Sequence, residues 1–486
     1  MNRNQVIAIA KKSKNNIKIQ YLGANNQVTG SCTYVQIKTD KQLNFLVDFG
    51  GIQDNRLNIE DYYKANSNNL PIDFSKLDYV LITHAHSDHI FKVGMLKSLG
   101  FKGKILCTVP TVDLMQLNLT DSAYIMDKEC QKFNTKNQTK GKKIYPLYTQ
   151  NCVEWAIDNT LGYDYNILID LDEYTTLEFL PAGHITGAAM VSIVHKYDGQ
   201  EKSMLFTGDT SGSREKVFTK SVDLKGRSYD YCQIESTYGN RLHPSKSPLE
   251  QLEQDIYNVV FERGKTLLIP VFAIARSTEV LHLLKQVYEK CPHFEDIPIF
   301  LASPMSCKAQ RIVSKDNLFQ YYDDKWSSEK DLFRWKQVTY IESFEDVKTQ
   351  LMNSKPKICV SASGMLDSGY SRFLTTCFAP QRGSKILFSG YQGDGTLGNL
   401  ILSKTQKSTT IDGKVIKFKA DIDLLQGMSS HADMNDLINL VKQIKGIKHI
   451  AVVHGDEEAS NNLKDKLSKI IKCDVEVPKY ESIYKF

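Results

Sequence analysis

The stretch THAHSDHI, residues 83–90, places three histidines and an aspartate close together, directly after the apolar run YVLI (79–82). On an extended segment side chains alternate, so His84 and His86 project to the same side and both imidazoles can reach one ion. Asp88 and His89 follow where the chain is expected to turn into a helix over DHIFKVGML (88–96), and they can hold a second ion. Two ions about 3.5–4 Å apart form a clamp for displacement at phosphorus. The pattern predicts a di-metal hydrolytic site at the end of a buried strand.

Further ligands must come from elsewhere in the chain, because four groups cannot complete two catalytic metal sites. LPAGHITGAAM (180–190) contains His184 and MLFTGDTSG (204–212) contains Asp209, each on a glycine-containing turn after a strand. A carboxylate can bridge two ions and leave a position for hydroxide. Taken singly, each turn is more often structural. Together they supply the missing imidazole and carboxylate.

The composition is that of a globular protein. The chain has 486 residues, 41% apolar and 24% charged, which predicts two or three domains. A net charge of +5 permits a polyanionic substrate without demanding one. The ten cysteines are scattered without a C-x-x-C pair, which favours reduced thiols over disulfides or a thiolate zinc site. No apolar run could span a bilayer, and the apolar island within residues 1–16 is too short for a signal peptide. We therefore expect a cytoplasmic protein with no membrane partner.

The two halves of the chain differ in texture. Short apolar runs fill residues 17–237 with few long helices, which predicts stacked sheets. The lysine-rich segment 132–143 is expected to be a solvated loop. From about residue 245 strands alternate with helices. The first helix begins at the N-cap Ser247, with Glu250 completing a capping box, and ends at Gly264. This alternation predicts βαβ units and a parallel sheet.

A domain of the second type is therefore inserted into one of the first type, because residues from 421 onward return to short strands and histidine-bearing turns. The expected boundaries are 1–240 for the first part of the metal domain, 241–408 for the insertion and 409–486 for the segment that completes the metal domain. The fold class is α/β.

Polar loops follow the strands of the insertion, at the edge of a parallel sheet where ligands bind. Arg276 precedes a helix and combines a cation with free N–H groups, which suits a phosphate. Hydroxyls and flexible backbone in the next loops suggest further contacts with a phosphate backbone, at Ser303, Ser361, Ser363 and Gly364. The alternative, that these are turn and capping residues, stays open.

Seven motifs, in order along the chain, resemble those of a known family. LVDFG (46–50), THAHSDH (83–89), AGHITGAAM (182–190) and TGDTSG (207–212) resemble the metallo-β-lactamase superfamily. ESTYGNR (235–241), GMSSHAD (427–433) and VVHGDE (452–457) resemble motifs A, B and C of its β-CASP branch, which includes the messenger-RNA 3′-end processing endonuclease, RNase J and short bacterial RNases. The resemblance spans residues 21 to about 460. It implies an αββα sandwich with an inserted β-CASP domain built on a mostly parallel sheet.

The resemblance also implies roles for individual residues. The expected zinc ligands are His84, His86 and His184 for one ion, Asp88, His89 and His454 for the other, and Asp209 as the bridge. The residues expected to take part in catalysis are Asp88, Asp48, Glu235 and His431. Of these, Asp48 would hold the loop of the first histidines and Glu235 would orient His431, the general acid. Relatives often have an aspartate before the SPM loop, whereas this chain has Ala302.

A two-zinc phosphodiesterase acting on single-stranded RNA is the function that these expectations favour. A metal-bridged hydroxide would attack phosphorus, and His431 would protonate the departing oxygen. RNA is favoured over DNA because DNA-directed relatives resemble one another in an apolar residue where this chain has His454. Endonuclease and 5′-exonuclease action, a homodimer and membership of an RNA-processing assembly all stay open. The alternatives are a non-cutting RNA-processing subunit and a hydrolase of small esters, lactones or thioesters.

The other histidines lack ligand spacing. We expect four of them to be structural, namely His195, His282, His293 and His449. His243, just after motif A, is the one that is left open as a residue lining the cleft.

Overall fold

The computed structural model describes residues 16–54, 56–67, 70–212, 219–220, 223–244, 246–323, 335–403 and 405–486. The apolar island near the N-terminus lies outside these residues. Among the described helices, none is both long and apolar enough to cross a membrane. All ten cysteines are free thiols, as their spacing predicted.

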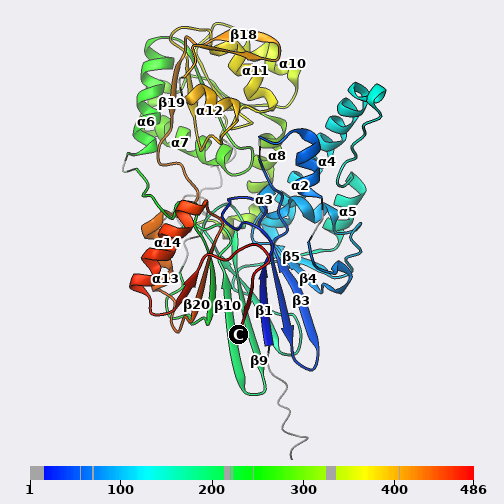
Figure 1. Cartoon of the computed structure of the whole chain (residues 1–486). Coiled ribbons are helices and arrows are strands. Elements are labelled where there is room, and N and C mark those ends of the chain that lie inside the picture. The colour runs from blue at the N-terminus through cyan, green and yellow to red at the C-terminus, as the bar shows by residue number, and fades with distance from the viewer. Residues whose placement is uncertain are drawn as a thin grey trace, which may run out of the picture.

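Two seven-stranded sheets stack face to face in the lower half of the molecule (Figure 1). The first contains, in spatial order, β22 (Ile483–Lys485), β1 (Asn16–Tyr21), β2 (Thr33–Lys38), β3 (Gln42–Val47), β4 (Tyr79–Leu81), β5 (Lys104–Thr108) and β6 (Thr160–Tyr163). The second contains β21 (Asp474–Glu476), β20 (His449–Val453), β11 (Tyr231–Glu235), β10 (Gln200–Phe206), β9 (Ala189–Tyr197), β8 (Thr175–Pro181) and β7 (Leu168–Asp170). Each sheet thus includes strands that precede residue 236 and strands that follow residue 448.

Alternation of apolar and polar residues builds the layer between the sheets. In TYVQIK of β2, Val35 and Ile37 are buried while Gln36 is partly exposed and Lys38 is exposed, as expected for a strand with one face in a core. Apolar side chains from both sheets meet in one cluster that includes Phe45, Phe179, Val191, Phe206 and Tyr231.

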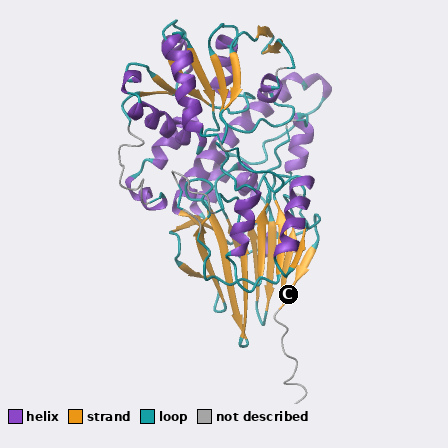
Figure 2. Cartoon of the chain, turned by 90° about the vertical axis from the view of Figure 1, so that its left-hand side faces the viewer, coloured by secondary structure: helices purple, strands orange, loops and turns teal. Residues whose placement is uncertain are grey.

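Helices cover the outer faces (Figure 2). On one side lie α2 (Ile59–Asn66), α3 (Ser87–Ile90), η2 (Phe91–Met95), α4 (Val109–Lys136) and α5 (Gln150–Asp158), and on the other α13 (Met434–Lys442) and α14 (Glu457–Ile470). Helix α4 contacts β5 and β6, and α14 contacts β20 and β21. The αββα sandwich is therefore confirmed.

A third sheet of six parallel strands lies in the upper half of Figure 1. Its spatial order is β14 (Val338–Ile341), β13 (Ile299–Ala302), β15 (Lys357–Ser361), β12 (Thr266–Pro270), β16 (Lys385–Phe388) and β19 (Asp421–Leu424). The helices around it are α6 (Pro248–Asp255), with a π-helical continuation η4 (Ile256–Glu262), α7 (Arg276–Lys290), α8 (Pro304–Val313), α10 (Phe344–Asp346), η8 (Val347–Leu351), α11 (Gly369–Phe378) and α12 (Leu397–Leu402). A hairpin of β17 (Ser408–Ile411) and β18 (Lys414–Lys417) and the short turns η1 (Phe74–Lys76), η3 (Gln138–Lys140), η5 (Pro292–Phe294) and η6 (Asp316–Tyr321) complete the described elements. The predicted parallel sheet is confirmed.

Two details differ from the sequence-based expectations. Residues 132–136 are not loop but the last turns of α4, because buried Ala123, Met126 and Cys130 continue the apolar face of that helix. The third sheet extends to Leu424, beyond the boundary predicted at 408/409, because β19 pairs in parallel with β16. On sheet membership we place the end of the insertion after Leu424.

Candidate metal centre

The turn after β4 and two other turns bring one group of donors together. Nε2 of His84 lies 3.1 Å from Nδ1 of His86, and Nε2 of His184 lies 3.1 Å from the same atom. Oδ2 of Asp209 is 3.5 Å from Nε2 of both His84 and His184. These four residues form the first cluster, whose donor atoms all lie within 4.8 Å of one another.

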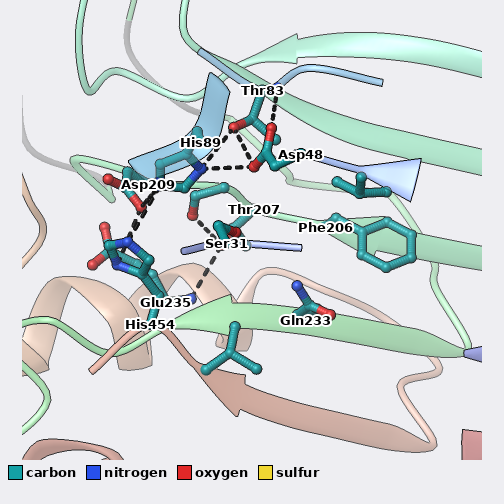
Figure 3. Close-up of a pocket in the computed structure, with 13 residues that line it drawn as sticks. Ser31, Asp48, Thr83, His89, Phe206, Thr207, Asp209, Gln233, Glu235 and His454 are labelled. Carbon is teal, nitrogen blue, oxygen red and sulfur yellow. Dashed lines mark hydrogen bonds and ion pairs between the residues drawn. The ribbon is translucent and has the colours of Figure 1, made fainter. Parts of the chain in front are cut away.

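A second cluster contains Asp88, His89, Asp209 and His454. Nε2 of His454 is 3.2 Å from Nε2 of His89 and 3.3 Å from Oδ2 of Asp88. Oδ1 of Asp209 lies 3.3 Å from Nε2 of His89. Figure 3 shows His89, Asp209 and His454 pointing toward one another. The structure thus brings together all seven predicted ligands.

Asp209 belongs to both clusters, one carboxylate oxygen facing each. Its side chain is 2% exposed, and Oδ1 has no hydrogen bond of good geometry within the described part of the chain, where the ring nitrogens of His89 and His454 lie 3.3 Å away. A buried carboxylate oxygen without a well-aligned donor is costly unless a cation satisfies it. Imidazole and carboxylate groups are the ligands that zinc takes at catalytic sites. The donor set therefore fits metal ions, and Asp209 fits as a bridge.

Neighbouring groups fix the orientation of the imidazoles. The carboxylate of Asp48 accepts the N–H and the hydroxyl of Thr83 at 2.8 and 2.9 Å and lies 2.7 Å from Nδ1 of His89 (Figure 3). The Ser430 carbonyl accepts a bond from Nδ1 of His184 at 3.2 Å. Such bonds direct the opposite nitrogen toward a metal. Sequence reasoning missed Thr83 and Ser430, although each stands next to a histidine of a motif.

Two of these residues have strained backbone. Asp48 has φ of 61° and His454 has φ of 52°, in the left-handed region that residues other than glycine seldom adopt. Strain of this kind persists where the surrounding structure fixes it, and it gathers at functional sites.

Burial and charge set the protonation of the clusters. Burial lowers the pKa of His84 well below its ordinary value and that of His86 to about 4. Both imidazoles are therefore neutral and able to bind a metal. Burial acts in the same direction on His89, but three carboxylates, Asp209 foremost, outweigh it and raise the pKa of His89 well above its usual range. Metal binding at the second cluster must displace that proton, so it depends on pH.

His431 stands beside both clusters without belonging to either ligand set. Its Nδ1 is 3.0 Å from each carboxylate oxygen of Glu235, and its Nε2 is 3.9 Å from Oδ2 of Asp209. The Glu235 side chain is 1% exposed and also accepts the backbone N–H of Thr210 at 2.7 Å and of Thr237 at 3.3 Å. A fixed carboxylate on one ring nitrogen leaves the other to exchange a proton at the site.

The predicted phosphate contacts divide into two groups. The Ser303 hydroxyl caps α8 by accepting the Ser306 N–H, and the buried Ser361 hydroxyl donates to the Ala302 carbonyl at 2.6 Å. These two positions match the capping and turn alternative. Arg276 binds Glu279 at 2.5 Å and Ser430 at 3.4 Å, so its guanidinium lies beside the loop of His431.

Ser363 and Gly364 lie in the loop after β15. Ser363 is partly exposed and its hydroxyl is 3.4 Å from the Ser368 carbonyl, so it is more open than the two buried serines. Gly364 is close to Phe272, and a Cβ there would lie 3.1 Å from the Phe272 nitrogen. Both keep their place among the predicted contacts.

The histidines expected to be structural lie away from the clusters. His195 bonds the Thr175 hydroxyl and His449 pairs with Glu476 and Asp474. His282 is buried in α7, and His293 packs on Phe294. His243, by contrast, donates from Nε2 to the His431 carbonyl at 2.8 Å.

The chain is similar to known protein families. Family models match for the metallo-beta-lactamase superfamily over residues 26–248, the Beta-Casp domain over 277–401 and the Zn-dependent metallo-hydrolase RNA specificity domain over 415–478. The transcription termination factor FttA of Methanocaldococcus jannaschii is 29% identical over 95% of this chain and 70% of its own length. Cleavage and polyadenylation specificity factor subunit 3-I of Arabidopsis thaliana is 26% identical over 92% of this chain and 60% of its own length. Endoribonuclease YSH1 of Candida glabrata is 25% identical, over 94% and 57%.

A crystal structure of a protein of unknown function from Enterococcus faecalis V583 shares the fold. It has a TM-score of 0.57 and 14% identity, covering 97% of this chain and 100% of that one. With three domain models in the expected order and relatives aligned over nearly the whole sequence, the chain belongs to the β-CASP branch of the metallo-β-lactamase superfamily.

Proposed function

We propose that the chain is a two-zinc phosphodiesterase that hydrolyses single-stranded RNA. The observation that carries this proposal is the pair His431 and Glu235, an imidazole held by a buried carboxylate next to two metal clusters. A small ester or lactone hydrolase needs the metals but has less use for a separate proton donor. Hydrolysis of a phosphodiester releases an alkoxide that requires one.

The ligand assignment follows the two clusters. His84, His86 and His184 would hold one zinc, Asp88, His89 and His454 the other, and Asp209 both. When bound, two zinc ions lower the pKa of water toward 7 and take up negative charge on the phosphate oxygens.

His431 would supply the proton to the departing oxygen. Because Nδ1 is engaged by Glu235, Nε2 is the atom that faces the clusters, 3.9 Å from the bridging carboxylate. Glu235 would favour the protonated ring through its negative charge. Asp48 would act at a distance by holding His89 and the loop that starts at Thr83.

The RNA backbone would be guided from the side of the inserted domain by Arg276, Ser363 and Gly364. Arg276 reaches Ser430, next to His431, so its charge lies near the phosphate that is cleaved. A fixed guanidinium suits phosphate recognition.

RNA is the substrate that the comparisons favour. One matching model is described as an RNA specificity domain, and the similar proteins include a polyadenylation factor subunit and an endoribonuclease. Internal cleavage and removal of nucleotides from the 5′ end use the same chemistry and are both kept. The proposal also includes a cytoplasmic location, a homodimer and membership of an RNA-processing assembly. Cell fractionation tests the location, mass measurement tests the homodimer, and co-purification tests the assembly.

Digestion of end-labelled single-stranded RNA and DNA, with and without a zinc chelator, tests the proposal. We expect RNA cleavage that chelation abolishes and zinc restores, with DNA cut more slowly. His431→Ala should retain zinc and lose RNA cleavage, while His293→Ala, at a surface turn, serves as the matched control. Hydrolysis of a lactone or thioester with both polymers intact would overturn the proposal. Binding of RNA without cleavage by the zinc-loaded protein would instead favour the non-cutting subunit.

A further inference from the structure

His243 lies where the chain leaves the metal domain for the insertion, five residues before helix α6 begins at Pro248. Its ring nitrogen Nε2 donates to the backbone carbonyl of His431 at 2.8 Å. Its backbone N–H donates to the carboxylate of Asp433 at 3.0 Å. His243 therefore holds the loop of the proposed proton donor at two points, although 188 positions of sequence separate it from His431.

The two segments that connect the insertion to the metal domain are bonded to each other at this place. The Arg241 carbonyl accepts the Met434 N–H at 3.1 Å, which adds a third bond to the two made by His243. On the returning segment, His431 follows Leu424, where β19 ends, by only seven positions. A displacement of the inserted sheet would reach His431 through this short segment unless bonds to the motif A side hold the loop in place.

The ring of Tyr238 packs against both imidazoles. Its centroid lies 5.3 Å from that of His243 and 6.2 Å from that of His431, each in an edge-on arrangement. Glu235 engages Nδ1 of the His431 ring, whereas His243 engages the main chain of the same residue. Glu235 thus fixes the rotation of the ring, and His243 fixes the backbone position from which the ring projects.

Two carboxylates close to His243 are accounted for by the helix that follows. A ring nitrogen of His243 and carboxylate oxygens of Asp433 and Asp436 all lie within 4.8 Å of one another. Asp433 is the N-cap of α13, and its carboxylate accepts the N–H groups of Asn435 and Asp436 at 2.9 and 3.0 Å besides that of His243. A carboxylate that accepts three N–H groups is satisfied without a cation. These contacts indicate an anchor for His243 and not a third metal site.

We propose that His243 is a positioning residue for His431, and this inference rests on the proposed function. By holding the His431 carbonyl, it keeps Nε2 of that ring directed at the departing oxygen. When the bond between phosphorus and the 3′-oxygen breaks, its electron pair stays on the oxygen, which takes the proton from Nε2 of His431. Proton transfer requires the donor within hydrogen-bonding reach, so a loose loop slows this step and leaves the attack on phosphorus unchanged.

Two RNA substrates that differ in one atom test this role with the zinc-loaded protein. One has the natural 3′-oxygen at a mapped cleavage position, and the other has sulfur in its place, so that a thiolate departs without needing a proton. His243→Phe keeps an aromatic ring against Tyr238 but has no N–H to donate. We expect it to lower the ratio of the oxygen rate to the sulfur rate roughly 2- to 12-fold, the equivalent of one neutral hydrogen bond. This ratio does not depend on how much of a variant is folded, because both substrates report on the same active molecules.

Companion variants separate the hydrogen bond from the volume of the side chain. His243→Gln, whose amide N–H can reach the same carbonyl, should recover most of the ratio. His293→Phe makes the same exchange at an exposed turn and should leave the ratio at the parent value. In the His431→Ala background, where the proposed donor is absent, His243→Phe should lower the ratio no further.

An unchanged ratio in His243→Phe, no recovery in His243→Gln, or a further fall in the His431→Ala background would each overturn the proposed role. Loss of a bound metal ion from His243→Phe would also overturn it, because His243 would then be a ligand. A parent protein that cleaves neither RNA would instead refute the proposed function, and the role of His243 with it.

Discussion

Replacing Glu235 by glutamine tests the role of the buried carboxylate. Glu235 receives three donors, the N–H groups of Thr210 and Thr237 and Nδ1 of His431. A glutamine has one acceptor oxygen and an NH₂ group that cannot face another donor, so at least one of these bonds is lost. Thr210 bonds one carboxylate oxygen and Thr237 the other, whereas Nδ1 of His431 lies 3.0 Å from both. The amide nitrogen of glutamine would therefore face a backbone N–H, and the imidazole would keep only a neutral oxygen in place of a carboxylate.

A hydrogen bond to a charged group is worth about 1.5–3 kcal/mol, and Glu235→Gln removes the charge from the bond to His431. If it acts only in the transition state, kcat on RNA falls roughly 10- to 150-fold. The assay compares RNA with bis(p-nitrophenyl) phosphate, whose p-nitrophenolate departs without a proton. We expect Glu235→Gln to slow RNA cleavage and to change hydrolysis of the small diester by less than about threefold. Equal losses on both substrates, or loss of zinc, would refute the reasoning, because Glu235 would then act on the metals or the fold.

Three further outcomes follow from the contacts described above. Asp48→Asn should weaken zinc binding at the second cluster about 10- to 100-fold, because the Thr83 N–H and His89 bond different oxygens of Asp48 and an amide has only one. A zinc titration that finds two equally tight ions would contradict this. Burial, aided by Lys285, lowers the pKa of His282 to about 3 from an ordinary 6.5, so between these values the unfolded chain binds a proton that the folded one does not, and stability falls as pH falls. Between pH 6.5 and 4 the free energy of unfolding of His282→Gln should therefore fall by roughly 2–3 kcal/mol less than that of the parent, as measured by urea unfolding. Parallel pH profiles for the two proteins would exclude this. Phe179→Ala, at a fully buried position between the two sheets, should cost about 3–5 kcal/mol, and a loss under about 1 kcal/mol would show that the sheets close over the gap.

Much of the two donor clusters was predictable because most of their residues stand in short motifs. His84 and His86 alternate on an extended segment, and the structure places their nitrogens 3.1 Å apart. The other ligands could not be predicted from local sequence, because they are far apart in the chain. His454 lies 3.2 Å from His89, and only the resemblance to a family predicted that the two belong together. Ser303 was predicted to contact a phosphate, and the structure shows a local role for it. A serine before a proline at a helix start is a cap first, and its hydroxyl is used in that way.

The fold was predictable where alternation or helical spacing is strong, as in β2 and α6. It was not predictable at the edges. The segment DIDL of β19 has two aspartates in four residues, and no pattern in it reveals which sheet accepts it. β19 belongs to the third sheet because it pairs in parallel with β16. The end of α4 was predicted to be a loop because its lysine-rich sequence contains no apolar face. It is helical as the continuation of α4, whose buried apolar face lies on earlier residues.

The sharing of Asp209 between the two clusters bears on how the protein is made. Every residue of the first cluster precedes the insertion, whereas the second cluster needs His454, about 240 residues after Asp209. At a synthesis rate of 5–20 residues per second, roughly 10–50 s separate their emergence. During that interval the nascent chain can take up one ion but lacks a ligand for the second, and it also lacks His431. If the proposed activity needs both clusters and His431, it cannot begin before residue 454 has been synthesised.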